Sequence, residues 1–442
     1  MTSDFPGELE AGTARVDITP EVGSELSGYI FPPRFSEGVR DPLYATAAVL
    51  RYGEEGLVLV SCDLIALGRE ICDLAKDSIA NRCGMGPERV MISCTHIHTG
   101  PNTGSIFSSR ADDEYLAGIP AAISDAVADA YARLSPALIS AATGREETLG
   151  FNRRYLMRDG RVETNPGIGN PQVLRPVAGI DPGMLAIVLT RRDGGVMGCI
   201  LNYSNHVDVL GGNLITSDYP GSVARMFRTR FGDRSNLVYL NGACGDVNHI
   251  DIHGPRKQGG PEKSEQMAKV LFSRLTDIMG RTRPLTSNIL EGGVEEVVLP
   301  RRKIPDQVIT DARRTLEESH EESLVTVLAR EVLAVDARAP RIPTLVQCLT
   351  LSDIALFGLP GEAFVDIGLE IKERSPFAHN AVVELANDYV GYLPTDIAFD
   401  QGGYEVRPAR SSQVGPGTQD ILVDAALKLA ARMSRDSEGD RH

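Results

Sequence analysis

The sequence predicts an α/β protein whose core is a mixed β-sheet flanked by helices. Three observations support this fold class. Apolar runs typical of strands alternate with segments of helical periodicity along the whole chain. The hydrophobic fraction of 42% and the charged fraction of 24% are ordinary for a globular protein. No internal repeat or low-complexity segment interrupts the pattern. We therefore expect one large domain over residues 1–442.

Strands are predicted where short apolar runs end at turn-forming residues. In chain order these runs are 12–18, 45–51, 56–61, 90–94, 137–142, 184–189, 196–203, 237–240, 289–299, 344–351, 354–357 and 381–385. Helices are predicted where apolar residues recur with a period near 3.6. These segments are 65–83, 112–133, 220–231, 261–279, 304–333, 363–374 and 418–434.

One helical segment differs from the others in its charge. The stretch 301–341 is dense in Glu and Arg at helical spacing, which predicts a helical insertion at 300–343 with a break near His320. The insertion could act as a lid, form a subunit contact or be a plain structural hairpin, and the sequence leaves all three roles open. The last residues, 436–442, are expected to form a disordered tail.

Composition restricts the partners. The net charge is −15, and no Lys- or Arg-rich run marks a phosphate-binding surface, so neither nucleic acid nor an anionic membrane is an expected partner. The sequence starts without the features of a signal peptide, and no run approaches the roughly 20 apolar residues of a membrane span. We expect a cytoplasmic protein that acts on a small-molecule substrate. The sequence leaves open whether the chain forms a homo-oligomer.

The strongest candidate for a functional site is a pair of histidines after the strand predicted at 90–94. His96 and His98 would share one face of an extended segment, with Cβ atoms roughly 7 Å apart. Two imidazoles so placed can bind one metal ion, and the turn that follows at 99–102 puts them at the end of the sheet. A surface or turn position is the alternative for such a pair.

Two further residues lie where predicted strands end. His206 follows the strand at 196–203, and Glu362 follows the strand at 354–357, where a helix-start charge is the alternative. Two histidines and a carboxylate around an open position are typical of a catalytic zinc site and favour hydrolysis. The small residues in 241–249 could bring backbone amides to an oxyanion.

The seven cysteines predict buried, reduced thiols, because they form no Cys-x-x-Cys pair and lie mostly in apolar runs. Cys94 and Cys244 are close in sequence to these candidate residues. Both lie on predicted strands rather than at helix N-termini, so a nucleophilic role is not favoured.

Several short motifs occur in the order found in one enzyme family. They are 11–20 (AGTARVDITP), 61–64 (SCDL), 95–101 (THIHTGP), 217–221 (SDYPG), 241–247 (NGACGDV) and 361–362 (GE). Together they resemble the neutral/alkaline ceramidase family. The resemblance implies a ceramidase-type catalytic domain that holds one zinc ion per chain and hydrolyses an N-acyl amide.

The same resemblance implies roles for individual residues. His96, His206, Glu362 and Tyr392 look like the four metal ligands. The groups that would contact the scissile amide are His98, Tyr404 and Arg153, with Arg154 as an alternative to Arg153. Apart from the resemblance, the candidate substrate-binding residues are Asn241, Asn248 and His249.

The departures from the family pattern bear on the substrate. Asn248 replaces a serine of the family motif, so a zinc-activated water is the expected nucleophile. If the run is extended, His249, Asp251 and His253 would share a face and could bind a polar substrate or a second metal; a surface or hydrogen-bonding role is the alternative. We also expect no C-terminal immunoglobulin-like domain and no secretory signal, which favours a small, polar substrate over ceramide.

These observations predict a zinc-dependent amidohydrolase that cleaves a C–N bond. A lactone or ester hydrolase that uses the same zinc site is the alternative among enzymes. A non-catalytic zinc-binding protein is the alternative outside them.

Overall fold

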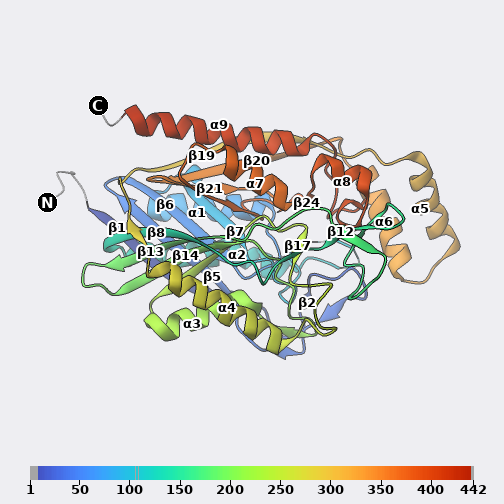
Figure 1. The fold of residues 1–442 in the computed structure, drawn as a ribbon, viewed down its shortest axis with the longest axis horizontal. Helices are drawn as coiled ribbons and strands as arrows, with labels where there is room; N and C mark the ends of the chain where they lie inside the picture. Colours follow the sequence, from blue (N-terminus) through green and yellow to red (C-terminus); the bar gives the residue numbers. More distant parts are fainter. Residues whose placement is uncertain (1–7, 105, 108, 440–442) are drawn as a thin grey trace.

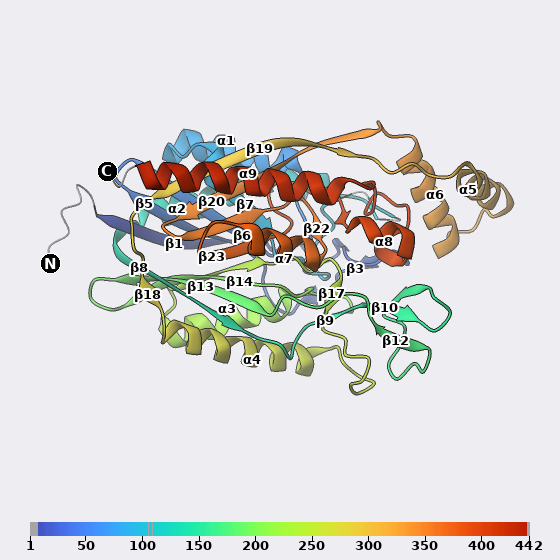
Figure 2. The ribbon, with the colours of Figure 1, turned by 45° about the horizontal axis from the view of Figure 1, so that its top comes forward.

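The protein has four layers in the order helix, sheet, sheet, helix (Figures 1 and 2). The computed structural model describes residues 8–439, apart from residues 105 and 108, and the backbone alone for 435–439. The prediction of a mixed-sheet core flanked by helices is confirmed. The sequence pattern did not indicate that the strands form two sheets packed face to face.

The large sheet contains nine strands, and most neighbours are antiparallel. Two pairs at its edges are parallel, β6 with β7 and β14 with β16. Its strands in spatial order are β16 (Asn236–Asn241), β14 (Val196–Tyr203), β13 (Gly183–Arg191), β8 (Ser135–Arg145), β1 (Leu9–Asp17), β5 (Tyr44–Tyr52), β6 (Glu55–Cys62) and β7 (Val90–Cys94), with β18 (Arg283–Pro284) beside β8.

The small sheet contains four strands and packs on the large one. Its order is β19 (Leu290–Pro300), β20 (Arg341–Leu351), β21 (Ile354–Gly358) and β23 (His379–Val383), with β21 and β23 parallel. Fully buried side chains from both sheets, such as Ile187, Leu240 and Val383, form the layer between them. Burial of each such side chain contributes about 1.5–3 kcal/mol.

Helices cover the two outer faces. The outer face of the large sheet packs against α1 (Arg69–Cys83), α2 (Asp113–Ala132), α3 (Asp218–Phe231) and α4 (Pro261–Met279). The outer face of the small sheet packs against α7 (Val365–Arg374) and α9 (Thr418–Gly439). Helix α9 extends into the segment 436–442 that was expected to be a tail, and residues 440–442 lie outside the described residues.

The helical insertion connects β19 to β20 and projects from one end of the molecule (Figure 1). It consists of α5 (Asp306–Glu318) and α6 (Leu324–Asp336), which enclose a small apolar cluster of their own. The break lies at 319–323, as predicted near His320, because Ser323 begins α6 with a capping box.

Short strands and turns connect the layers near the site. They are β2 (Glu25–Leu26) with β3 (Arg34–Phe35), β4 (Gly38–Val39) with β15 (Leu214–Ile215), β9 (Phe151–Asn152) with β17 (Val247–Asn248), β22 (Glu362–Ala363) with β24 (Tyr392–Leu393), and β10 (Arg154–Met157) between β11 (Val162–Thr164) and β12 (Val173–Pro176). Helix α8 (Asp396–Gln401) and 3₁₀ turns at Pro87–Arg89 and Tyr404–Val406 complete the described elements.

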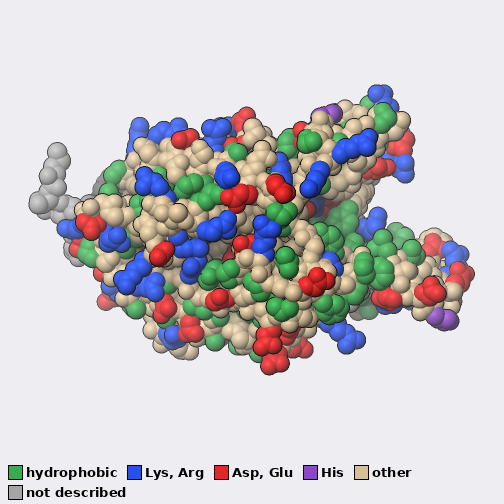
Figure 3. Space-filling model, turned by 90° about the horizontal axis from the view of Figure 1, so that it is seen from below, with side chains coloured by type: hydrophobic (Ala, Val, Ile, Leu, Met, Phe, Trp, Pro, Cys, Tyr) green, Lys and Arg blue, Asp and Glu red, His purple; other side chains and the backbone are tan. Residues whose placement is uncertain are grey.

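The surface carries charges of both signs. On the face shown in Figure 3, Lys and Arg side chains are interspersed with Asp and Glu, and two projections extend from one end of the molecule. Among the described helices, none combines the length and the apolar character that a bilayer crossing requires.

Candidate metal centre and active site

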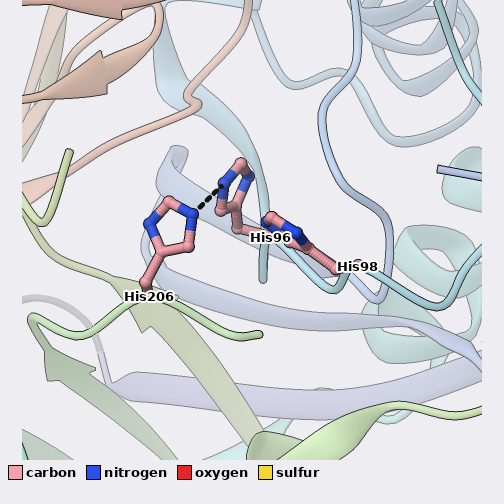
Figure 4. A group of neighbouring side chains, drawn as sticks. All are labelled: His96, His98 and His206. Carbon is pink, nitrogen blue, oxygen red and sulfur yellow. Dashed lines mark hydrogen bonds between the residues drawn. The ribbon is translucent and has the colours of Figure 1, made fainter. Parts of the chain in front are cut away.

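Three histidines converge where the parallel strands of the large sheet end. His96 and His98 follow β7, and His206 follows β14. Their rings point toward one another, and one nitrogen from each lies within 4.8 Å of the other two (Figure 4). His96 Nε2 lies 3.1 Å from His206 Nε2. The three histidines form a group that could hold a metal ion.

Glu362 supplies an oxygen to the same group. Its Oε2 lies 3.4 Å from His96 Nε2 and has no hydrogen-bond partner among the described residues, although it is buried. In a tetrahedral zinc site with bonds of 2.0–2.1 Å, ligand atoms lie roughly 3.3 Å apart. The distances from His96 Nε2 to His206 Nε2 and to Glu362 Oε2 both fit such a site.

The hydrogen bonds of His96 also fit a metal ligand. Its Nδ1 donates to the carbonyl oxygen of Ile65 at 2.9 Å, so we assign the proton of the neutral ring to Nδ1. The Nε2 lone pair then faces the carboxylate of Glu362, and a cation between them would relieve their repulsion. Burial alone would lower the pKa of His96, but the Glu362 carboxylate raises it overall.

The backbone at His96 differs from the sequence prediction. Strand β7 ends at Cys94, so His96 and His98 are not neighbours on one face of a strand. His96 instead has φ of 70°, a left-handed conformation that is uncommon for a residue other than glycine. The prediction that strand alternation aligns the two rings is therefore wrong. A strained turn brings them together, and such strain is concentrated at functional sites.

The residues around Glu362 come from two paired segments. Strands β22 and β24 pair Glu362 directly with Tyr392, so the predicted carboxylate and tyrosine ligands lie side by side. Tyr389 donates a hydrogen bond to Glu362 Oε1 at 2.8 Å and leaves Oε2 for the histidines. Helix α7 begins only at Val365, so the alternative of a helix-start charge for Glu362 is wrong.

Arg153 is buried and acts on the site through Tyr392. Its Nη2 donates to the Tyr392 hydroxyl at 2.9 Å and to the carbonyl of Gly245 at 2.7 Å. Its Nε donates to Glu405 Oε1 at 2.8 Å, and Glu405 is fully buried. Arg153 does not line the cavity described below, so it positions Tyr392. Arg154 also contacts Glu405 and extends to the carbonyl of Gly402.

The Arg153–Glu405 pair supports a stability prediction. Replacement of Glu405 by alanine would leave the Arg153 guanidinium buried without its carboxylate, and we expect the free energy of unfolding to fall by about 3–5 kcal/mol. Urea unfolding at 25 °C measures this loss. In the matched control, Glu147→Ala, the exposed Arg145–Glu147 pair is lost at a cost below about 1 kcal/mol. Equal losses in both variants would contradict the prediction.

His98 is held from outside by the loop at 27–34. Arg34 donates to the carbonyl oxygens of Ser27 and His98, each at 2.7 Å. Gly28 lies against the imidazole with φ of 93°, and a Cβ there would come within 2.5 Å of His98 Cβ. His98 Nε2 is buried without a partner among the described residues. Burial and the nearby His96 lower the pKa of His98 to about 4.

The three predicted substrate-binding residues lie away from the cavity wall. Asn241 donates to Glu384 Oε1 at 3.1 Å, and burial raises the pKa of Glu384 to about 8. Asn248 donates to Asn165 Oδ1 at 3.3 Å, and His249 Nδ1 donates to Asp208 Oδ1 at 3.0 Å. These contacts are structural, and substrate contact by these three residues stays a prediction.

Two expectations for the nearby loop are corrected. The segment 241–249 was a candidate source of backbone amides for an oxyanion, but four amides already donate within the fold: Gly242 to Tyr203, Cys244 to Glu384, Gly245 to Ala363 and Val247 to Cys244. The run from His249 to His253 is a turn, in which His249 is buried and His253 exposed.

All seven cysteines are buried free thiols, and burial raises the pKa of Cys244.

A cavity of about 410 Å³ opens onto the histidines. The predicted residues on its wall are His96, His98, Glu362, Tyr392 and Tyr404. Ile65, Ala66, Ile106 and Phe107 supply an apolar surface. The rings of Tyr392 and Tyr404 meet edge to face, with centroids 5.8 Å apart. The cavity therefore joins an apolar wall to the candidate metal group.

Sequence reasoning missed Tyr389 and Glu405, which hold Glu362 and Arg153. Each lies within three residues of a predicted site residue, in the segments 387–395 and 404–406. That adjacency is a weak signal, because hydrogen bonds of this kind depend on segments far apart in the chain.

The fold and the site define a class of protein: a four-layer α/β domain with a histidine group, able to hold a metal ion, where its parallel strands end. Solved structures with this fold include two ceramidases. Neutral ceramidase from Pseudomonas aeruginosa matches with a TM-score of 0.73 and 18% identity, over 97% of this chain and 75% of that chain. A ceramidase complexed with C2 matches with the same TM-score and identity, over 96% and 76%.

The chain therefore has a neutral ceramidase-like fold, and the resemblance carried by the short motifs is confirmed for the fold. No model of a protein family matches the sequence, and a search of curated proteins found no match.

Proposed function

We propose that the protein is a zinc-dependent hydrolase that cleaves a C–N bond, that of an N-acyl amide, in a small, polar substrate. The observation that carries the proposal is the arrangement of side chains where the cavity opens onto the histidine group. Imidazole nitrogens of His96 and His206 and an unpaired oxygen of Glu362 meet there, beside the unpaired Nε2 of His98. The ceramidase-like fold supports an amide as the bond that is cleaved.

The donor set fits zinc, which prefers imidazole nitrogen and carboxylate oxygen at four positions. His96, His206 and Glu362 would hold the ion, and Tyr392, paired with Glu362, is the proposed fourth ligand. A zinc ion bound there acidifies water and polarises a carbonyl group.

The side chains supply the remaining chemistry. His98 belongs to the histidine group and its Nε2 has no partner among the described residues, so it can accept a proton from the attacking water and return it to the nitrogen of the departing amine. The Tyr404 hydroxyl lies on the cavity wall and is the proposed donor to the negative charge that develops on the acyl oxygen. Arg153 contributes by fixing the Tyr392 hydroxyl.

The test is metal removal followed by a substrate panel. We expect the protein as purified to contain about one zinc ion per chain, a chelator to abolish hydrolysis, and added zinc to restore it. The panel pairs each N-acyl amine with the lactone or ester of the same acyl group. Faster turnover of lactones or esters would favour the alternative enzyme. Zinc that is retained with no hydrolysis of any panel member would favour a non-catalytic zinc-binding protein.

A further inference from the structure

One end of the cavity is positively charged. Among the described residues that line the cavity, Arg338 and Arg410 are its only Lys or Arg side chains, and Gln413 lies with them. Arg338 follows helix α6 of the insertion, and Arg410 follows the turn that carries Tyr404. Glu362 is the only carboxylate among the same lining residues, and it belongs to the histidine group.

The charge of Arg410 is balanced locally. Glu331 of helix α6 is fully buried and accepts from Arg410 Nη2 at 2.5 Å and from the Arg410 amide at 2.8 Å. Glu331 also accepts from the amide of Phe107 at 2.7 Å. Both of its oxygens therefore accept hydrogen bonds, and among the described residues its only ion pair is with Arg410.

Arg338 and its neighbours have no such balance. Arg338 Nη1 and Arg301 Nη1 both donate to Gln413 Oε1, a neutral acceptor. Within the described part of the chain, neither arginine forms an ion pair, and Arg302 beside them forms none either. Arg338 is exposed; its partial burial and the nearby Arg410 lower its pKa, against the opposing effect of the Glu331 carboxylate. Among the described ion pairs, Arg410 is the only one of these four arginines that pairs with a carboxylate, in a protein whose net charge is −15.

We propose that Arg338 binds a carboxylate of the substrate, so that the enzyme acts on N-acyl amides with a free carboxylate away from the scissile bond. The inference rests on the proposed function and specifies its substrate class. A guanidinium forms two parallel, charge-assisted hydrogen bonds to a carboxylate, and a planar anion is the ligand that this geometry favours. The apolar wall with Ile106 and Phe107 would accommodate the chain between the two polar ends.

The experiment compares substrates that differ only in charge. N-acetylglycine, 4-acetamidobutanoate and 6-acetamidohexanoate are each assayed beside the corresponding carboxamide. For at least one length, we expect kcat/KM of the wild-type enzyme to be higher for the carboxylate by roughly 10- to 100-fold. In Arg338→Gln the ratio of the carboxylate rate to the carboxamide rate should fall to about one, and Arg338→Lys should retain part of the preference.

A matched control separates a local effect from a general change of charge. Arg314→Gln removes an exposed arginine of the same insertion, on helix α5, and should leave the preference unchanged. A wild-type enzyme that hydrolyses both members of every pair equally well would overturn the proposal. A carboxylate preference that survives in Arg338→Gln would also overturn it, because the anion would then bind elsewhere, for example at the metal.

Binding distinguishes failure of this inference from failure of the proposed function. Calorimetry with 6-acetamidohexanoate and 6-acetamidohexanamide, on the zinc-loaded protein, needs no turnover. If no panel member is hydrolysed, a preference for the carboxylate that is lost in Arg338→Gln still supports the anion site and rejects only the hydrolase. Equal affinity for the two compounds in the wild type overturns the anion site.

Discussion

Replacement of His96 by alanine is expected to remove the metal and the hydrolytic activity together. His96 Nε2 lies 3.1 Å from His206 Nε2 and 3.4 Å from Glu362 Oε2, so its loss removes the ligand that contacts both of the others. A metal Lewis acid supplies several kcal/mol to such a reaction, and we expect kcat/KM to fall by roughly 10³-fold or more. Elemental analysis of the dialysed variant measures the zinc content.

The control is His320→Ala, which removes an exposed histidine between α5 and α6 and should change neither quantity. A His96→Ala variant that retains one zinc ion per chain and the wild-type rate would refute the metal site. Circular dichroism and urea unfolding of the same sample show whether the variant is folded, since His96 occupies a strained backbone position.

Replacement of His98 by alanine is expected to remove activity and leave the zinc in place. His98 belongs to the three-histidine group, so its position fits two roles, a third nitrogen ligand or a proton carrier. The lack of a hydrogen-bond partner at its Nε2 among the described residues and its place on the cavity wall favour the proton carrier. Loss of a general acid–base costs about 10²- to 10⁴-fold in rate.

Zinc content decides between the two roles. If His98→Ala loses zinc to the same extent as His96→Ala, His98 is a metal ligand and another group must carry the proton. If the zinc stays and kcat falls while KM changes little, the proton-carrier role holds, because the lost interaction is then one made in the transition state. The measurement uses the same dialysis and elemental analysis for both variants.

Local sequence patterns predicted most elements of the fold. The predicted strands at 90–94 and 196–203 and the predicted helix at 261–279 have the bounds that the structure shows. Their apolar periodicity reflects which face of each element is buried, and that is a local property of the sequence. The helix predicted from residue 65 instead begins at Arg69, and the carbonyl of Ile65 is thereby free to accept from His96.

The sequence did not predict how the elements pack. It indicated a mixed sheet but not two sheets face to face, because a strand buried on both faces has the same composition in either arrangement. It also did not predict that four amides of segment 241–249 already donate hydrogen bonds within the fold. Those bonds depend on Tyr203, Ala363 and Glu384, which lie on other strands and loops.

The sequence by itself determined the fold class and placed His96, His206 and Glu362 after strands, because the period of apolar residues and the residues that end a strand are local features. The tertiary structure alone decided the distances among those side chains, the contacts of Tyr389 and Glu405, and the place of Arg338 on the cavity wall. Each of these depends on packing between segments far apart in the chain. The tertiary structure also decided the turn at His96, because its left-handed backbone persists only where the surrounding structure holds it.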